Sequence, residues 1–185
     1  MISNYSCNVS IGKNVYIHPS TVLWGIVRIG NNVSIGPNCT IGYDGFQFPR
    51  DKDGVPYFDE HYGGVIIEDN VVIQSNCAVS RARIKNDNTI IGKNTKLDNL
   101  IHIAHNCKIG ESNIFAAGVV LSGGVHIGEK NFFGIRCGII NDCHIGSYNM
   151  IGMSCNIIRD IDDNGVWVGN PAKKIRDNNF FNKEK

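Results

Sequence analysis

An aliphatic or aromatic residue recurs at every sixth position along most of this 185-residue chain. A first run covers positions 11–41. A second run, two residues out of phase, covers positions 67–157 and misses once, at Lys85. Glycine often follows the recurring residue, as at Gly12 and Gly128. A short fixed period of this kind is the signature of a solenoid, whose repeats bury their apolar faces only against neighbouring repeats.

Each six-residue repeat is long enough for one short strand and one turn. The recurring residue and a small residue four positions later point inward, while Gly, Asn and Asp tolerate the tight turns. Three repeats make a triangular coil of about 18 residues, and parallel strands of successive coils lie about 4.8 Å apart. We therefore expect one all-β domain over residues 1–176, a parallel β-helix of about seven coils. A loop is inserted at residues 43–64, and a short polar tail follows at 177–185.

The cysteines follow the same pattern. Six of the seven stand four positions after a recurring residue, in a slot that elsewhere holds Val and Thr: Cys39, Cys77, Cys107, Cys137, Cys143 and Cys155. Because a buried free cysteine behaves as a small hydrophobe, the slot predicts inward-facing thiols and not disulfides or a metal centre. Cys7 lies outside the slot, and the pattern gives it no role.

Composition excludes several classes of partner. A net charge of +1 without a basic cluster argues against nucleic acid. No run of about 18 apolar residues is present, so we expect no membrane span. The polar start of the chain lacks the regions of a signal peptide. We expect a cytoplasmic protein.

The inserted loop carries six aromatic residues within 22 positions: Tyr43, Phe46, Phe48, Tyr57, Phe58 and Tyr62. Such a density predicts packing on the prism, on a neighbouring subunit or on a flat ligand such as a nucleotide base. Tyr43, Phe46 and Phe48 are the candidates for substrate contact.

The segment IHIAHNCKIG at 101–110 holds His102, expected to face outward, and His105, expected near a prism corner. One coil further on, 18 residues along in the predicted stack, Gly123 should lie directly over His105. A base beside an exposed backbone N–H suits acyl transfer. His126 and His144 should also stack on each other, but two histidines alone do not make a zinc site.

These segments resemble known families. IHIAHNCKIG resembles the histidine segment of the lipid A acyltransferases and of the bacterial nucleotide-amino-sugar N-acetyltransferases, which are left-handed parallel β-helices with hexapeptide repeats. DNLIHIAHN, with the loop beginning GYDGF, resembles the UDP-3-O-acylglucosamine N-acyltransferase branch. LSGGVHIG and GVWVGNPAKKI resemble the acetyl-CoA-dependent sugar acetyltransferases, including sialic-acid O-acetyltransferases. The left hand is implied by this resemblance alone, since parallel crossovers are normally right-handed.

The resemblance also implies roles for particular residues. His105 would be the catalytic base, and the amide of Gly123 would face the thioester carbonyl. Asp87 and Asp98 are candidates for the carboxylate that orients His105, while His102 and Asn106 are candidates for substrate contact. The residues implied to lie against coenzyme A are Gly169, Asn170, Pro171, Ala172 and Lys173 in the GNPAK turn, with Lys174 and Arg176 near its phosphates.

The chain departs from the two branches in four ways. Asn106 stands where the acetyltransferases often have Asp, and Asp142 stands where the lipid A enzyme has a second histidine. The resemblance covers about residues 11–176 and includes neither branch's N-terminal substrate domain. The acyl-carrier-protein-binding C-terminal helices of the lipid A enzyme have no clear match.

The expectation that follows is a homotrimer with active sites between adjacent prisms. It would transfer acetyl from acetyl-CoA to the amino group of a UDP- or dTDP-linked amino deoxysugar, without a metal. Sugar O-acetylation and acyl transfer from acyl carrier protein are the close alternatives. A zinc-dependent carbonic anhydrase-like enzyme and a non-catalytic trimeric scaffold are alternatives of other classes, because fold alone does not decide function.

Overall fold

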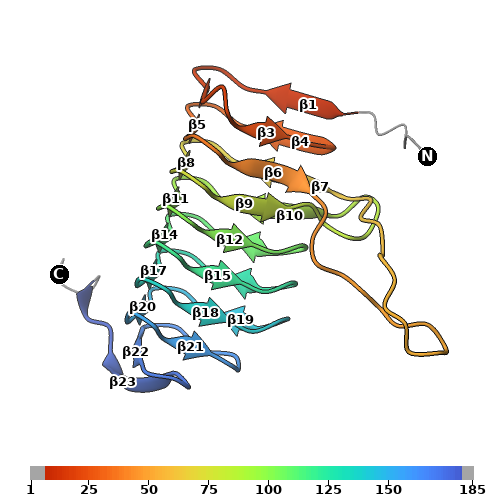
Figure 1. Ribbon diagram of the computed structural model, residues 1–185. Helices are drawn as coiled ribbons and strands as arrows, with labels where there is room; N and C mark the ends of the chain where they lie inside the picture. Colours follow the sequence, from red (N-terminus) through yellow and green to blue (C-terminus); the bar gives the residue numbers. More distant parts are fainter. Residues whose placement is uncertain (1–6, 181–185) are drawn as a thin grey trace.

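The computed structural model describes residues 7–180, which form a left-handed parallel β-helix. Short strands stack into three parallel sheets, A, B and C, and these are the faces of a triangular prism (Figure 1). Within the described residues no helix is long and apolar enough to cross a membrane.

Each strand pairs with the strand one coil away. Sheet A contains β1 (Asn8–Ile11), β4 (Ile26–Ile29), β7 (Gly64–Ile67), β10 (Asn88–Ile91), β13 (Lys108–Ile109), β16 (His126–Ile127) and β19 (His144–Ile145). Sheet B contains β2 (Tyr16–Ile17), β5 (Ser34–Ile35), β8 (Val72–Ile73), β11 (Lys96–Leu97), β14 (Ile114–Phe115), β17 (Phe132–Phe133), β20 (Met150–Ile151), β22 (Gly165–Val168) and β23 (Lys173–Asp177). Sheet C contains β3 (Val22–Leu23), β6 (Thr40–Tyr43), β9 (Ala78–Ser80), β12 (His102–Ile103), β15 (Val120–Leu121), β18 (Gly138–Ile139) and β21 (Asn156–Ile157).

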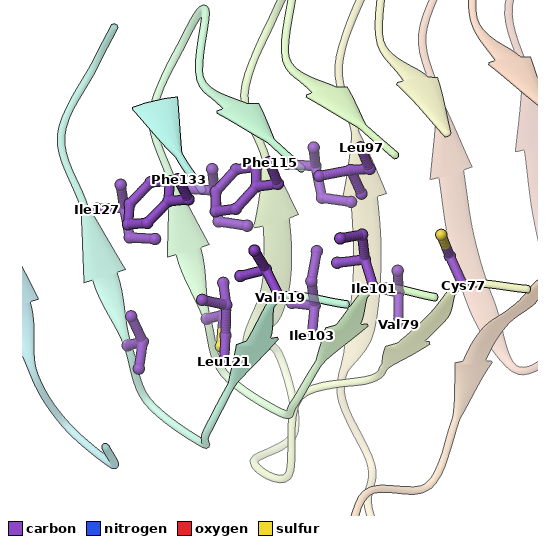
Figure 2. Close-up of a cluster of buried hydrophobic side chains, with 14 of the residues drawn as sticks. Cys77, Val79, Leu97, Ile101, Ile103, Phe115, Val119, Leu121, Ile127 and Phe133 are labelled. Carbon is purple, nitrogen blue, oxygen red and sulfur yellow. The ribbon is translucent and has the colours of Figure 1, made fainter. Parts of the chain in front are cut away.

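The recurring apolar residues form the core of the prism, as the sequence predicts. Figure 2 shows them pointing inward from neighbouring strands, with the rings of Phe115 and Phe133 stacked at 4.6 Å between centroids. The six cysteines of the repeat slot are buried among them, Cys7 is exposed, and all seven are free thiols. Each coil therefore buries its apolar residues against the next coil, which is how a solenoid gains stability.

The register of the stack breaks twice. Ile29 pairs with Ile67 because the inserted loop lies between β6 and β7. Ile67 then pairs with Ile91, which is 24 and not 18 positions further on. The repeat expected around Lys85 is therefore not a face of the prism. Residues 81–87 instead form a second, shorter excursion, which we call the 81–87 loop.

The two loops leave the prism at the same corner, between sheets C and A, and they bond to each other. The N–H of Gly63 donates to the carbonyl of Ala82 at 2.9 Å, and the N–H of Tyr62 donates to the carbonyl of Arg83 at 3.0 Å. Figure 1 shows the longer loop, in orange, projecting from the stack at this corner. This corner departs from the plain repeat, and it is the corner that carries His105.

The C-terminal end of the prism is closed by a hairpin. β22 continues sheet B in parallel with β20, and β23 turns back antiparallel to β22. β23 extends to Asp177, and Asn178 is buried. The folded unit thus continues past residue 176, where the sequence analysis ended the domain. Residues 181–185 of the expected tail lie outside the described residues.

Candidate active site

His105 lies at the corner between sheets C and A, in a column with Arg81 one coil below and Gly123 one coil above. Strands β9, β12 and β15 set this column, because Ile103 pairs with both Val79 and Leu121. The N–H of Gly124 donates to the carbonyl of His105 at 2.9 Å. The structure therefore places Gly123 over His105, as the sequence predicts.

Only glycine fits directly above this histidine. A Cβ added to Gly123 would lie 2.5 Å from Cε1 and 2.7 Å from Nε2 of His105. Because real Cβ atoms do not approach other heavy atoms so closely, any side chain at position 123 displaces the imidazole. The backbone of Gly123 thus lies against the Nε2 edge of the ring.

Asn106 fixes the tautomer of His105. Its Oδ1 accepts from the backbone N–H of Arg83 at 3.1 Å, and its Nδ2 donates to Oδ2 of Asp87 at 2.6 Å. With the amide oriented in this way, Oδ1 faces Nδ1 of His105 at 2.9 Å. An amide oxygen only accepts, so Nδ1 carries the proton and Nε2 keeps its lone pair. His105 is therefore held in the form that takes a proton at Nε2.

Asp87 anchors this chain of hydrogen bonds. Its Oδ1 accepts from the Lys108 ammonium at 2.5 Å and from the N–H of Asn88 at 2.7 Å. Burial raises the pKa of Asp87, but the hydrogen bonds from Lys108, Asn106 and Asn88 outweigh it and leave the pKa below its ordinary value. Asp87 is therefore a carboxylate at neutral pH.

Two sequence-based assignments change at this site. Asp98 accepts from the N–H groups of Asn99, at 2.8 Å, and Ala117, at 3.1 Å. It therefore caps a turn of the prism and does not orient His105. The side chain of Asn106 is occupied by His105 and Asp87, so it positions the base and is not free for substrate.

The route from Asp87 to His105 also differs from the expected one. Stacking by 18 residues would place Asp87 directly below His105, but the longer register places Arg81 there. Asp87 ends the 81–87 loop and reaches the base through Asn106. Counting the missed repeat at Lys85 as a loop is the sequence signal that could have placed Arg81 under His105.

The backbone N–H of Gly123 is available to a ligand. At other corners the equivalent N–H is capped by the side chain one coil above: Lys13 by Asn31 at 2.8 Å, and Glu129 by Ser147 at 3.0 Å. Among residues 7–180 no acceptor contacts the N–H of Gly123. A free N–H beside the lone pair of a histidine is the arrangement that stabilises an oxyanion next to a base.

The aromatic residues of the inserted loop gather away from the prism. Phe48 lies 4.9 Å from Phe46 and 5.8 Å from Phe58 between ring centroids. Phe46 is 84% exposed, and the other two are also exposed. Tyr43, at the end of β6, packs edge-on against Trp24 at 5.8 Å and is also exposed. Of the three interpretations of the loop, packing of these three phenylalanines on the prism is the one that the structure contradicts.

The segment GNPAK forms the turn between β22 and β23, at the end of sheet C. Asn156 receives the turn, because its N–H donates to Gly169 at 3.2 Å and its carbonyl accepts from Ala172 at 2.8 Å. The turn lies four strand steps, about 19 Å, from His105 along the prism. Lys173, Lys174 and Arg176 in β23 are exposed, and Lys174 pairs with Asp177 at 2.8 Å.

Three further histidines, His102, His126 and His144, lie apart from this chain of contacts. His102 projects from sheet C, and burial lowers its pKa. His126 and His144 stack on sheet A with ring centroids 4.8 Å apart, as their spacing predicts. Within residues 7–180 no group of three or more His, Cys, Asp or Glu side chains is arranged to hold a metal ion.

Comparison with known proteins identifies the repeats. A model of the bacterial transferase hexapeptide, described as six repeats, matches residues 8–43 and 88–123. The chain is 35% identical over 118 residues to a UDP-3-O-acylglucosamine N-acyltransferase of Anaeromyxobacter dehalogenans, covering 61% of this chain and 33% of that protein. It is 51% identical over 82 residues to a second such enzyme, from Sulfurimonas denitrificans, covering 44% of this chain and 25% of that one. The chain thus spans a third or less of these two relatives.

A solved structure shares the architecture. The UDP-N-acetylglucosamine O-acyltransferase of Moraxella catarrhalis superposes with a TM-score of 0.62 and 27% identity, covering 92% of this chain and 73% of that chain.

Proposed function

Because this chain carries the hexapeptide repeats of bacterial transferases, we propose that it is an acyltransferase acting on the amino group of a nucleotide-linked amino sugar. The observation that carries the proposal is the arrangement at His105: a histidine fixed with Nε2 unprotonated, beneath a glycine whose N–H is available. Both named relatives are N-acyltransferases of a UDP-linked amino sugar.

The reaction follows from these groups. The neutral amine of the sugar attacks the carbonyl carbon of a thioester, and Nε2 of His105 takes the proton that the amine loses. The N–H of Gly123 stabilises the tetrahedral oxyanion. Collapse of the intermediate breaks the C–S bond, and the thiolate leaves with the proton held by His105. The products are the amide and the free thiol, without a covalent enzyme intermediate.

The C-terminal hairpin is the proposed contact for the donor. The GNPAK turn lies beyond Asn156 at the end of sheet C, whose strand β12 leads to His105, and the exposed basic side chains of β23 follow the turn at the edge of sheet B. Between them, Gly138 carries no side chain in the outward column of sheet C, and the amide oxygen of Asn156 lies against it. An extended phosphopantetheine arm fits this path, with its thioester at Gly123 and its phosphates near Lys173 and Arg176. We take acetyl-CoA as the first donor.

The acceptor would lie on the other side of His105. The aromatic cluster of Phe46, Phe48 and Phe58 offers exposed rings on which a nucleobase can stack. Tyr43 and His102 are further proposed contacts for the sugar nucleotide. A homotrimer, with each site between two prisms, would supply the second wall of the pocket.

A thiol-release assay tests the proposal. Purified protein is incubated with acetyl-CoA and a panel of UDP- and dTDP-linked amino sugars, beside His105→Ala. We expect turnover with one sugar and a loss of about 10²-fold or more in the variant, the range for removing a general base. Turnover that survives in His105→Ala contradicts the role of this histidine.

A second candidate donor is acyl carrier protein carrying a longer acyl chain, because the two relatives are named as N-acyltransferases and not as N-acetyltransferases. Running the same assay with acyl carrier protein thioesters of several chain lengths separates the donors. Replacing the amino sugars with the corresponding hydroxyl sugars tests O-acylation by the same residues.

A further inference from the structure

A second histidine lies behind the candidate base. His61, in the inserted loop, is fully buried, and its ring packs edge-on against His105 with centroids 5.3 Å apart and an interplanar angle of 65°. The sequence analysis did not identify this residue. Its position depends on how the inserted loop returns to the prism, which the repeat does not specify.

The contacts of His61 define its protonation state. Nδ1 lies 3.1 Å from the carbonyl oxygen of Asp59, and a carbonyl only accepts, so Nδ1 carries a proton. Burial, followed by the neighbouring His105, lowers the pKa of His61. His61 is therefore a neutral imidazole with its lone pair on Nε2.

That lone pair has no hydrogen-bond partner among the described residues, although Nε2 is completely buried. The surroundings of Gly45 locate Nε2 of His61. A Cβ added to Gly45 would lie 3.2 Å from Nε2 of His61 and 3.1 Å from Cδ2 of His105. Both atoms thus border the space that Gly45 leaves empty. A buried acceptor without a donor is costly and calls for an explanation.

We infer that His61 is a positioning residue for proton transfer at His105. The inference rests on the function proposed above. When His105 takes a proton at Nε2, the positive charge spreads over the ring, including the Cδ2–H group that faces the empty space beside Gly45. The lone pair of His61 borders the same space and stabilises this charge, most strongly because the surroundings exclude water. The acceptor that lacks a donor in the resting protein thus acts on the imidazolium formed during the reaction.

The surrounding charges are arranged around this pair. Asp44 lies 3.9 Å from Nδ1 of His61 and is paired with Arg81 at 2.6 Å, which offsets its charge. The Asp87 carboxylate, which reaches His105 through Asn106, is paired with Lys108. Each nearby carboxylate therefore has its own cation. The lone pair of His61 is the uncommitted acceptor next to the Cδ2 edge of His105.

Two substitutions distinguish the effect of the His61 lone pair from the effect of its planar ring. His61→Phe keeps a planar ring without an acceptor, whereas His61→Gln keeps an acceptor. In the thiol-release assay we expect His61→Phe to lower kcat about 10-fold with KM for the donor within about twofold, because a less favoured imidazolium makes a weaker base. We expect His61→Gln to stay within about threefold of the parent chain. The acidic limb of the pH–rate profile should move to lower pH in His61→Phe alone.

A purely structural role predicts a different result, namely a raised KM and an acidic limb that stays in place in both variants. That outcome overturns the inference, as does an equal loss of kcat in His61→Phe and His61→Gln. Thermal unfolding of each variant identifies a loss of activity that comes from loss of fold, and in that case the spectra described next decide.

The ring nitrogens can be observed without turnover. In protein labelled with ¹⁵N-histidine, long-range proton–nitrogen spectra report the tautomer and charge of each of the six histidines. We expect neutral His61 with Nδ1 protonated at pH 7, and a smaller imidazolium fraction for His105 in His61→Phe at pH 6. An unchanged His105 signal overturns the inference. Because no substrate is present, this result is independent of whether the proposed acyl transfer is correct.

Discussion

At the scale of single residues, Gly123 is the position most sharply constrained by the site. Gly123→Ala places a methyl group 2.5 Å from Cε1 of His105 and must displace the ring. We expect kcat/KM to fall about 10²-fold or more, since both the base and the N–H donor move. Gly152→Ala is the matched control, because its Cβ would lie 3.2 Å from a methyl of Val168, at the opposite side of the prism. Equal activity of Gly123→Ala and the control would show that the stacking is not used in the reaction.

Asp87 acts on His105 through two hydrogen bonds, one from Asn106 to Asp87 and one between Asn106 and His105. Asp87→Asn keeps its size but removes the charge that orients Asn106, so we expect kcat to fall about 10-fold with KM almost unchanged. Asp98→Asn, at the carboxylate that caps Ala117, should retain full activity. Steady-state kinetics of the two variants decide between these carboxylates, and a larger loss in Asp98→Asn would contradict the assignment.

How well the sequence predicts each residue depends on whether the register is regular at that point. Gly123 could be placed over His105 because the 18-residue spacing holds across β12 and β15. The regular spacing alone misplaces Arg81, which needs the missed repeat at Lys85 to be counted as a loop, and it gives no position for His61, because the two loops break the spacing just below His105. A period specifies where inward residues stack, but it does not specify how an insertion folds back.

At the scale of elements, a ladder of buried asparagines supports the C-terminal half of the prism. Oδ1 of Asn113 accepts from Asn131, Oδ1 of Asn131 accepts from the N–H of Asn149 at 2.8 Å, and Asn149 accepts from the indole of Trp167 at 3.0 Å. The three amides are almost completely buried. Each rung satisfies backbone groups that the turn would otherwise leave without partners.

Breaking the middle rung tests the ladder. Asn131→Ala leaves the N–H of Asn149 buried without a partner and removes one of the two donors to the oxygen of Asn113, whose other donor is the backbone N–H of residue 131. We therefore expect the free energy of unfolding to fall by about 1–3 kcal/mol. Asn31→Ala, which removes an exposed cap on Lys13, should cost less than about 1 kcal/mol. Urea unfolding followed by circular dichroism measures both, and equal losses would contradict a special role for the buried ladder.

The inserted loop makes stability depend on pH. The pKa of His61 is lowered in the folded protein, so below about pH 6.5, its unfolded value, the unfolded chain binds more protons than the folded one. Stability should therefore fall as the pH falls, by at most about 1.4 kcal/mol per unit for this residue. Thermal unfolding between pH 7.5 and 5.5 should show a smaller loss for His61→Phe. Parallel losses in the two proteins would show that His61 does not titrate on unfolding.

At the scale of the whole molecule, the six-residue period predicts almost the entire architecture. The period specifies strand length, the inward residues and the number of coils, because every coil repeats the same local solution. The period does not predict the C-terminal hairpin, in which β23 pairs antiparallel with β22 at the edge of sheet B. The left hand of the helix came from a family resemblance and not from the period.

Mixing two inactive variants tests whether the proposed donor path lies on one prism or is shared between two subunits of the proposed trimer. If the base of one subunit works with the basic β23 strand of its neighbour, two inactive variants can complement each other. His105→Ala carries an intact hairpin, while a variant with Lys173 and Arg176 both changed to Glu carries an intact base. The donor path proposed above runs along the prism that carries His105, so co-refolding the two variants in equal amounts should restore no activity. A site shared between neighbouring subunits would instead recover about a quarter of the wild-type sites, because each site would need two intact partners.

Light scattering gives the first check, a particle of three times the 20.4 kDa chain mass. Activity of the co-refolded mixture then distinguishes the arrangements. Recovery near a quarter means that each site is shared between neighbouring subunits. If each site lies within one chain, half of the chains lack the base and the other half lack the donor contact, so mixing restores nothing. A trimer without recovery would therefore place the donor path along the sheet C face of the same prism that carries His105.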